Sequence, residues 1–173
     1  MIGKNRITII IGDDNLELCK LMQTYLQEFS DIEILGTTSD GEEQIKMIEL
    51  LKPNIVITDL KRNTGISGWE VLKKCHELQL DETKFIVATA AYYRETMEKL
   101  KNMGIKHILF KPFPFKNLIN EIREIENEEE NSLTIINNDI SKSKRTFIAV
   151  LRQKLMSLKI IRWKEKVWNK RKH

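Results

Sequence analysis

Residues 7–14 read ITIIIGDD, a β-branched apolar run closed by a glycine and two aspartates. A continuous run of this kind is typical of a strand buried on both faces of a parallel sheet. Short apolar runs at 55–58, 84–88 and 106–110 are likewise followed by polar residues and then by helix-like segments. Because the carboxyl ends of parallel strands meet at one edge of a sheet, and ligands bind there, the pattern predicts a functional edge.

Strand-then-helix repeats account for about the first 125 residues and predict a sheet with helices on both faces. The expected strands are 6–12, 32–35, 55–58, 84–88 and 106–110, and the expected helices are 15–28, one capped by Ser39–Gly41, 69–78, 92–103 (stopped by Gly104) and 115–126. Right-handed crossovers and the chain length favour the strand order 2-1-3-4-5. The predicted fold is α/β, a five-stranded parallel sheet of the doubly wound, flavodoxin-like (βα)5 type.

Charge is distributed unevenly along the chain, whose net charge is +4. Residues 131–173 hold twelve Lys or Arg against two acids, whereas residues 1–130 hold 17 basic and 23 acidic residues. This change predicts a domain at 1–126, an acidic linker at 127–132 and a basic, partly helical tail at 133–173 that begins with a short strand. A basic tail of this kind suggests contact with a polyanion.

Several classes of protein are disfavoured by composition. No apolar run approaches the roughly 20 residues of a membrane-spanning helix, and the start is too short in apolar residues for a signal peptide, so we expect a cytoplasmic protein. Cys19 and Cys75 lack metal-ligand spacing and are expected to be buried or half-buried free thiols. The three histidines form no ligand pair either. Any metal chemistry is therefore expected to use oxygen ligands.

Five polar residues at the predicted strand ends suit phosphoryl chemistry: Asp13, Asp14, Asp59, Thr89 and Lys111. Close carboxylates raise one another's pKa unless a cation joins them, and an all-oxygen ligand set favours Mg²⁺. Lys111 offers a point charge for a phosphoryl oxygen, and Thr89 offers a hydroxyl. A carboxylate is also a competent nucleophile that forms an aspartyl-phosphate. We interpret the set as a phosphorylatable switch.

These residues resemble the CheY-like receiver domain of two-component response regulators. The motifs that carry the resemblance are Asp13-Asp14-Asn15, Asp59, Thr89-Ala90 and Lys111-Pro112-Phe113, within about residues 5–126. Within the family, Gly12–Leu18 and the stretch GIKHILFKPF at 104–113 are most similar to the stage 0 sporulation protein A-type regulators of spore-forming bacteria. Nothing here resembles the large DNA-binding domain of those regulators. We therefore interpret the tail as a truncated or atypical effector.

The resemblance implies that Asp59 accepts a phosphoryl group from a sensor histidine kinase or a phosphotransfer protein. It assigns Thr89 and Lys111 to the phosphoryl group. The Mg²⁺ ligands that it implies are Asp13, Asp14, Asp59 and the backbone carbonyl of Lys61. Such a protein is no enzyme beyond self-phosphorylation and self-dephosphorylation.

The resemblance also implies an output surface made by the helix at 92–103, the strand at 106–110 and the helix at 115–126. We expect the protein to signal through this surface and to form a homodimer there, and to regulate transcription through its tail. Ile108 and Pro112 fall in its switch region, and a cis Lys111–Pro112 bond is implied. In a protein of this kind, phosphorylation shifts the balance between two conformations of the output surface.

The chain departs from the family pattern after Asp59. Arg62-Asn63 stand where Met-Pro is usual, and the loop 61–68 is one residue longer, with two glycines that make it supple. We expect Arg62 to compete with Lys111 for the phosphoryl group.

Two further positions depart from the family. Ile108 replaces the usual aromatic switch residue, and the small Ala91 leaves the phosphoryl site open to water. These departures predict unusual kinetics or coupling. They also support an alternative, a phosphorylation-independent pseudo-receiver that acts as a protein- or DNA-binding module.

The tail beyond residue 143 is expected to be a basic amphipathic helix with apolar residues at three- and four-residue steps. Candidate nucleic-acid contacts are Arg145, Arg152, Lys159, Arg162, Lys164 and Lys166. An anionic membrane surface, the chain's own acidic domain and a solvated extension are the other interpretations. A flavin carrier is disfavoured, because the acids after the first strand would repel its phosphate.

Overall fold

The computed structural model describes residues 6–63, 65–80, 82–132, 134–135 and the single positions 140, 142, 144 and 146. The chain divides into two compact units, Met1–Ile125 and Glu126–His173. Thr134 and Ile135 are helical, so the short strand predicted at 133–136 is wrong at both of its described positions. The basic residues proposed for nucleic-acid contact lie outside the described residues. No helix in the described part of the chain is both long and apolar enough to cross a membrane.

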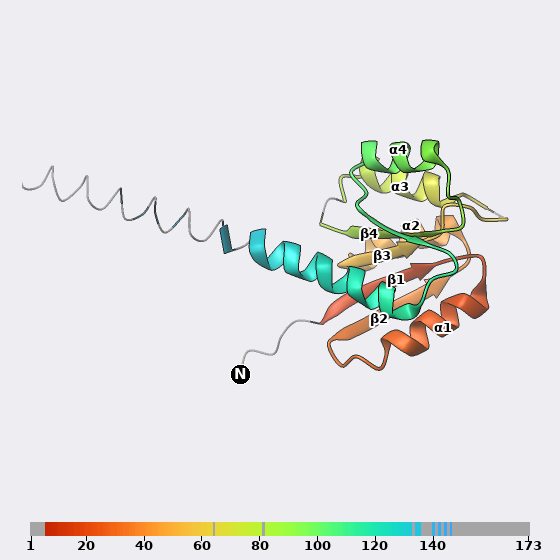
Figure 1. Cartoon of the computed structure of the whole chain (residues 1–173), viewed down its shortest axis with the longest axis horizontal. Coiled ribbons are helices and arrows are strands. Elements are labelled where there is room, and N and C mark those ends of the chain that lie inside the picture. The colour runs from red at the N-terminus through yellow and green to blue at the C-terminus, as the bar shows by residue number, and fades with distance from the viewer. Residues whose placement is uncertain are drawn as a thin grey trace, which may run out of the picture. The chain divides into compact units, whose positions relative to one another are not determined.

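The first unit is built on one sheet of five parallel strands in the order β2-β1-β3-β4-β5, which confirms the predicted fold class (Figure 1). The strands are β1 (Ile7–Gly12), β2 (Ile32–Thr38), β3 (Ile55–Thr58), β4 (Lys84–Thr89) and β5 (His107–Phe110). In the central pair, Gly12 of β1 is level with Thr58 of β3. The residues that follow these two strands therefore begin at the same height, at the carboxyl edge of the sheet.

Helices cover both faces of the sheet, and Figure 1 shows α1 on one side of the strands and α3 and α4 on the other. The helices with printed bounds are α1 (Leu16–Leu26), α2 (Gly41–Leu51), α3 (Gly68–Glu77) and α4 (Arg94–Asn102), and residues 115–132 are also helical. Alternate β1 residues face opposite ways: Ile9 packs with Met22 of α1, whereas Ile10 packs with Ile48 of α2. This alternation explains why the strand is apolar throughout.

Local capping sets the helix ends. The side chain of Asn15 accepts the N–H of Leu18 at the start of α1, and Ser67 and Glu70 form a capping box at the start of α3. The residue before α4, Tyr93, makes no side-chain cap, and α4 begins two residues later than the sequence predicts. Gly104 has a φ of 76°, the left-handed conformation that the sequence predicts after this helix.

Both cysteines are free and buried, as predicted. Burial raises the pKa of the Cys19 thiol to about 11, and it does the same to Cys75. The Cys19 thiol lies 3.5 Å from the carbonyl oxygen of Asp13, directly behind the polar edge of the sheet. Both thiols are therefore part of the core.

Candidate metal and phosphoryl site

Three carboxylates converge at the carboxyl edge of the central strands. Asp13 and Asp14 follow β1, Asp59 follows β3, and one oxygen of each lies within 4.8 Å of the others. Asp13 is 1% exposed and Asp59 is 8% exposed. The backbone N–H of Asp59 donates to the carbonyl of Gly12 at 3.0 Å, which continues the ladder between the strands past their ends. The sheet thus brings together the acids that the sequence predicts for a metal site.

Lys111 bridges two of these acids from the end of β5. Its Nζ donates to Asp13 Oδ2 and, at 2.7 Å, to Asp59 Oδ2. Burial opposes the charge on Lys111, but the hydrogen bonds to the two carboxylates outweigh it and raise the pKa of the lysine. Burial raises the pKa of Asp13, and the hydrogen bond from Lys111 only partly offsets this. Lys111 therefore stays positively charged within the cluster of acids.

Thr89 and the Lys111–Pro112 peptide bond also lie at this edge, whereas Ile108 lies further back in β5 beside Val87 of β4. Thr89 is fully buried at the end of β4, its Oγ1 accepts the N–H of Ala91 at 3.1 Å, and its carbonyl accepts the N–H of Lys111 at 2.9 Å. The Lys111–Pro112 peptide bond is cis, as the resemblance implies. Ile108 packs against a core cluster that includes Leu100 of α4. Position 108 is therefore filled by aliphatic packing between β5 and α4.

An aromatic pair lies beside this position. The ring of Tyr92, which follows β4, meets the ring of Phe110 edge-on, with centroids 4.5 Å apart. Tyr92 itself is 77% exposed. Phe110, the last residue of β5, therefore contacts the segment that follows Thr89.

The loop after β3 binds the acids through groups that the sequence analysis did not single out. The backbone N–H of Lys61 donates to Asp59 Oδ1 at 3.2 Å. Asn63 donates twice to Asp14 Oδ2, from its backbone N–H at 3.0 Å and from Nδ2 at 2.6 Å. In the sequence, Asn63 stands out only as a departure from the family pattern. Its amide side chain, a hydrogen-bond donor, is the feature that could have predicted a contact with a carboxylate.

Arg62 points into the domain and bonds to neutral groups. Its Nη2 donates to Gln44 Oε1 and, at 3.2 Å, to Thr58 Oγ1. Gln44 is fully buried on α2 and also donates to the carbonyl of Ile57 at 3.2 Å. Burial lowers the pKa of Arg62, against the charges of nearby acids that raise it. Gln44 was missed from sequence, where a polar residue on the inner face of α2 was its only signal.

The loop is packed closely against the backbone of Asp59. A Cβ at Gly68 would lie 1.9 Å from the backbone oxygen of Asp59, and one at Gly41 would lie 2.4 Å from the backbone oxygen of Ile66. Gly65 has a φ of 69°. Gly68, which the sequence analysis interpreted as a source of suppleness, is instead required by close approach of the backbone.

The donor set fits Mg²⁺. Mg²⁺ prefers oxygen ligands and binds through one or two carboxylates together with phosphate oxygens and waters. Asp13, Asp14 and Asp59 bring three negative charges, of which Lys111 offsets one by direct contact. These residues, with the carbonyl of Lys61, could hold a divalent cation beside Asp59.

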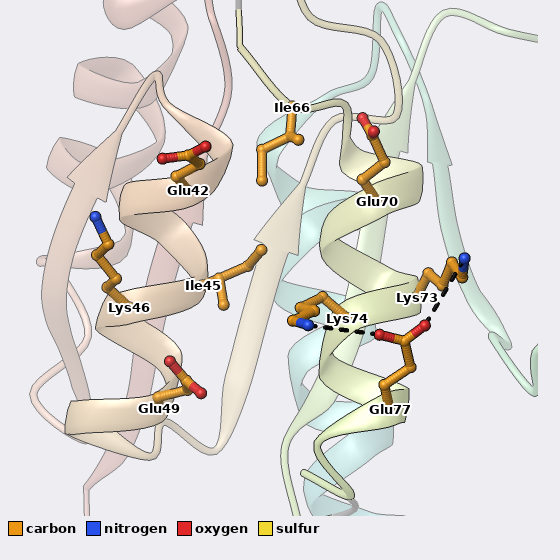
Figure 2. Close-up of a pocket in the computed structure, with 9 residues that line it drawn as sticks. All are labelled: Glu42, Ile45, Lys46, Glu49, Ile66, Glu70, Lys73, Lys74 and Glu77. Atoms are coloured by element: carbon orange, nitrogen blue, oxygen red, sulfur yellow. Dashed lines mark ion pairs between the residues drawn. The ribbon is translucent and has the colours of Figure 1, made fainter.

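Away from the acid cluster, a hollow with a volume of about 430 Å³ lies between α2 and α3 (Figure 2). Its lining residues are Glu42, Ile45, Lys46, Glu49, Ile66, Glu70, Lys73, Lys74 and Glu77. Charges of both signs line it, and Glu77 pairs with Lys73 at 3.7 Å and with Lys74 at 3.6 Å. It shares no residue with the acid cluster, and its mixed charges favour no ligand of one sign.

Comparison with known proteins places this site in a family. Residues 9–123 match the response regulator receiver domain. A DNA-binding response regulator of the LuxR family from Staphylococcus aureus is 28% identical, with a TM-score of 0.64 over 69% of this chain and 98% of that one. A CheY-like receiver domain protein from Methanospirillum hungatei JF-1 is 25% identical, with a TM-score of 0.65 over 74% of this chain and 99% of that one.

A more distant structure shares the fold alone. It is the CheX-CheY-BeF3-Mg complex from Borrelia burgdorferi, 18% identical over 70% of this chain and 90% of that one, with a TM-score of 0.63. The family match spans most of the 173 residues, and it contains all five polar residues at the strand ends. The chain therefore belongs to the response regulator receiver domain family.

Proposed function

We propose that this chain is a phosphorylation-dependent switch whose acceptor is Asp59. The phosphoryl donor is a phosphohistidine on a sensor histidine kinase or a phosphotransfer protein, the partners typical of receiver domains. The observation that carries the proposal is the lysine bridge: Lys111 contacts both Asp13 and Asp59 inside a cluster of three acids. The proposed Mg²⁺ ligands are Asp13, Asp14, Asp59 and the carbonyl of Lys61.

In the proposed reaction a carboxylate oxygen of Asp59 attacks phosphorus. The phosphorus–nitrogen bond to the donor histidine breaks, and its electron pair stays on the imidazole nitrogen, which then takes a proton. Lys111 neutralises charge on the phosphoryl oxygens, and Thr89 donates its hydroxyl to one of them. Mg²⁺, when bound, supplies further charge neutralisation. The only other reaction that we propose is hydrolysis, in which water breaks the bond between the phosphoryl group and Asp59 and releases inorganic phosphate and the free carboxylate.

The proposed output is carried by α4, β5 and the helix that begins at residue 115, the surface that also forms a homodimer. Ile108 packs there between β5 and α4. Regulation of transcription is proposed because the Staphylococcus aureus relative is described as a DNA-binding response regulator. DNA contact through the basic tail, a role in sporulation and a cytoplasmic location remain predictions.

The test is phosphorylation by a small donor. The full chain is incubated with Mg²⁺ and acetyl phosphate, and phosphate-affinity gels compare it with Asp59→Asn and with a matched control, Asp40→Asn. Asp40 is an exposed carboxylate that caps α2, and asparagine also caps helices. We expect a shifted band in the wild type and the control and none in Asp59→Asn.

The alternative is a pseudo-receiver that works by binding alone. It is supported by Asn63, which bonds to Asp14, and by the aliphatic residue at position 108. A folded wild-type protein that takes no phosphoryl group and binds no beryllofluoride would support this alternative.

A further inference from the structure

The acid cluster is bonded from within the chain. Five of the six carboxylate oxygens of Asp13, Asp14 and Asp59 accept an N–H donor. The donors are the backbone N–H groups of Asn15, Lys61 and Asn63, the side-chain amide of Asn63 and the ammonium of Lys111. A divalent cation that binds through these five oxygens competes with the N–H donors for their lone pairs.

Asn63 holds the carboxylate that is the most accessible of the three. Asp14 is half-buried, whereas Asp13 and Asp59 are buried. Both donors of Asn63 point at the same oxygen of Asp14, at 3.0 and 2.6 Å. Charge-assisted hydrogen bonds of this length are among the stronger ones in proteins. Asn63 therefore occupies Oδ2, one of the two Asp14 oxygens through which a cation could bind.

Arg62, the preceding residue, places a second cation beside the cluster. Its Nη2 is bonded, but Nε and Nη1 are buried and have no hydrogen-bond partner among the residues that the structure describes. An arginine in this state is stabilised by the field of the acids around it, Asp13 and Asp59 foremost. A cation bound to the same acids would cancel that field, so the arginine and the cation oppose each other.

Arg62 and Asn63 are adjacent, and neighbouring groups hold the chain on both sides of them. Arg62 is tied to Gln44 and Thr58, and Asn63 follows it directly. Beyond the loop, Gly68 leaves no room for a side chain against Asp59. Displacement of the guanidinium would therefore change the position of Asn63 as well.

We propose that Arg62 and Asn63 form an internal latch that competes with a divalent cation for the acid cluster and so sets the cation affinity. The inference rests on the proposed function, because it takes the cluster as the metal site. The latch belongs to this chain, since both residues stand where the family pattern differs. In the latched state Asn63 holds Asp14 and Arg62 supplies positive charge. In the cation-bound state Asn63 has released Asp14, and the bound cation supplies the positive charge that Arg62 supplies in the latched state.

Isothermal titration calorimetry with MgCl2 tests the latch on the full, EDTA-treated chain. The variants are Arg62→Met, which removes the charge, and Asn63→Ala, which removes the Nδ2 donor and keeps the backbone N–H. Arg94→Met is the matched control, because it makes the same change at an exposed arginine paired with Glu98. We expect Mg²⁺ to bind at least about fivefold more tightly to Arg62→Met, the lower end of usual coupling between two competing groups. Asn63→Ala should bind about threefold more tightly, and the control should match the wild type.

Equal or weaker Mg²⁺ binding by both loop variants would overturn the latch, and so would an absence of Mg²⁺ binding in every protein. Circular dichroism identifies a variant that fails to fold. If Arg62→Met fails to fold, the Mg²⁺ affinity of Asn63→Ala alone tests the latch. Phosphorylation of the wild type by acetyl phosphate separates the two proposals. A phosphorylated wild type with unchanged affinity in the variants refutes the latch only. Tighter Mg²⁺ binding in the variants without any phosphorylation refutes the proposed function only.

Discussion

Two cations flank the acid cluster, and they are held in different ways. Lys111, at the end of β5, contacts the carboxylates of Asp13 and Asp59 directly. Arg62, after β3, is bonded to the neutral groups of Gln44 and Thr58 and reaches the acids only through its field. The lysine is therefore part of the acid network, whereas the arginine is a neighbour of it.

This difference separates what the chain shares with its family from what it adds. The lysine belongs to the family signature and lies where a strand end must place it. The arginine lies on a loop whose sequence departs from the pattern, and buried polar side chains hold it. Removal of the lysine, which leaves two buried acids without their cation, should lower stability strongly, while the arginine should act mainly on cation binding.

The largest effect that distinguishes the two cations is expected from Lys111→Met. This change leaves Asp13 and Asp59 without their ammonium, and removal of one partner from a buried pair costs about 3 kcal/mol. Arg62→Met should lower the free energy of unfolding by only about 1 kcal/mol, because the partners that it leaves are neutral. Urea unfolding in EDTA measures both, with the exposed Lys61→Met as the control for charge. Equal losses in the lysine and arginine variants would contradict the comparison.

A smaller effect tests how firmly the arginine side is packed. Gly68→Ala would place a Cβ against the backbone oxygen of Asp59, and overpacking of this kind should lower the free energy of unfolding by about 2 kcal/mol. Gly104→Ala is the matched control: nothing lies within 4 Å, and only its positive φ is strained, so about 1 kcal/mol is expected. Thermal unfolding ranks the two. A larger loss of stability in Gly104→Ala than in Gly68→Ala would show that the loop shifts to make room for the added Cβ.

The smallest effect concerns the acid that Lys111 holds. Burial raises the pKa of Asp13, so the folded state binds its proton more tightly than the unfolded state does. The corresponding stabilisation is present below the unfolded pKa of about 4 and is lost as the pH rises through the folded pKa. Asp13→Asn should therefore be about 1 kcal/mol more stable than the wild type at pH 7 in EDTA. Urea unfolding from pH 7 to pH 4 should show this advantage shrinking, and an advantage that grows toward pH 4 would contradict the assignment.

The sequence could predict the sheet and the convergence at its edge, but not the latch. Asp13, Asp59 and Lys111 follow apolar strands, and parallel strands must end on one side, so their proximity follows from periodicity. No comparable pattern in the sequence predicts where the side chains of Asn63 and Gln44 lie. The direction of a loop side chain, or of a polar residue on a helix, is set by tertiary packing that no local pattern encodes. The added loop length indicated a change in the site without showing its form.

The burial of both thiols has a practical consequence for labelling chemistry. The 173 residues contain only Cys19 and Cys75, and burial raises the pKa of each to about 11. Alkylating reagents attack the thiolate, so the folded protein should react slowly at neutral pH. A single cysteine introduced on the surface would be the fast-reacting group. A variant with one introduced surface cysteine can therefore carry a site-specific probe without prior removal of Cys19 and Cys75.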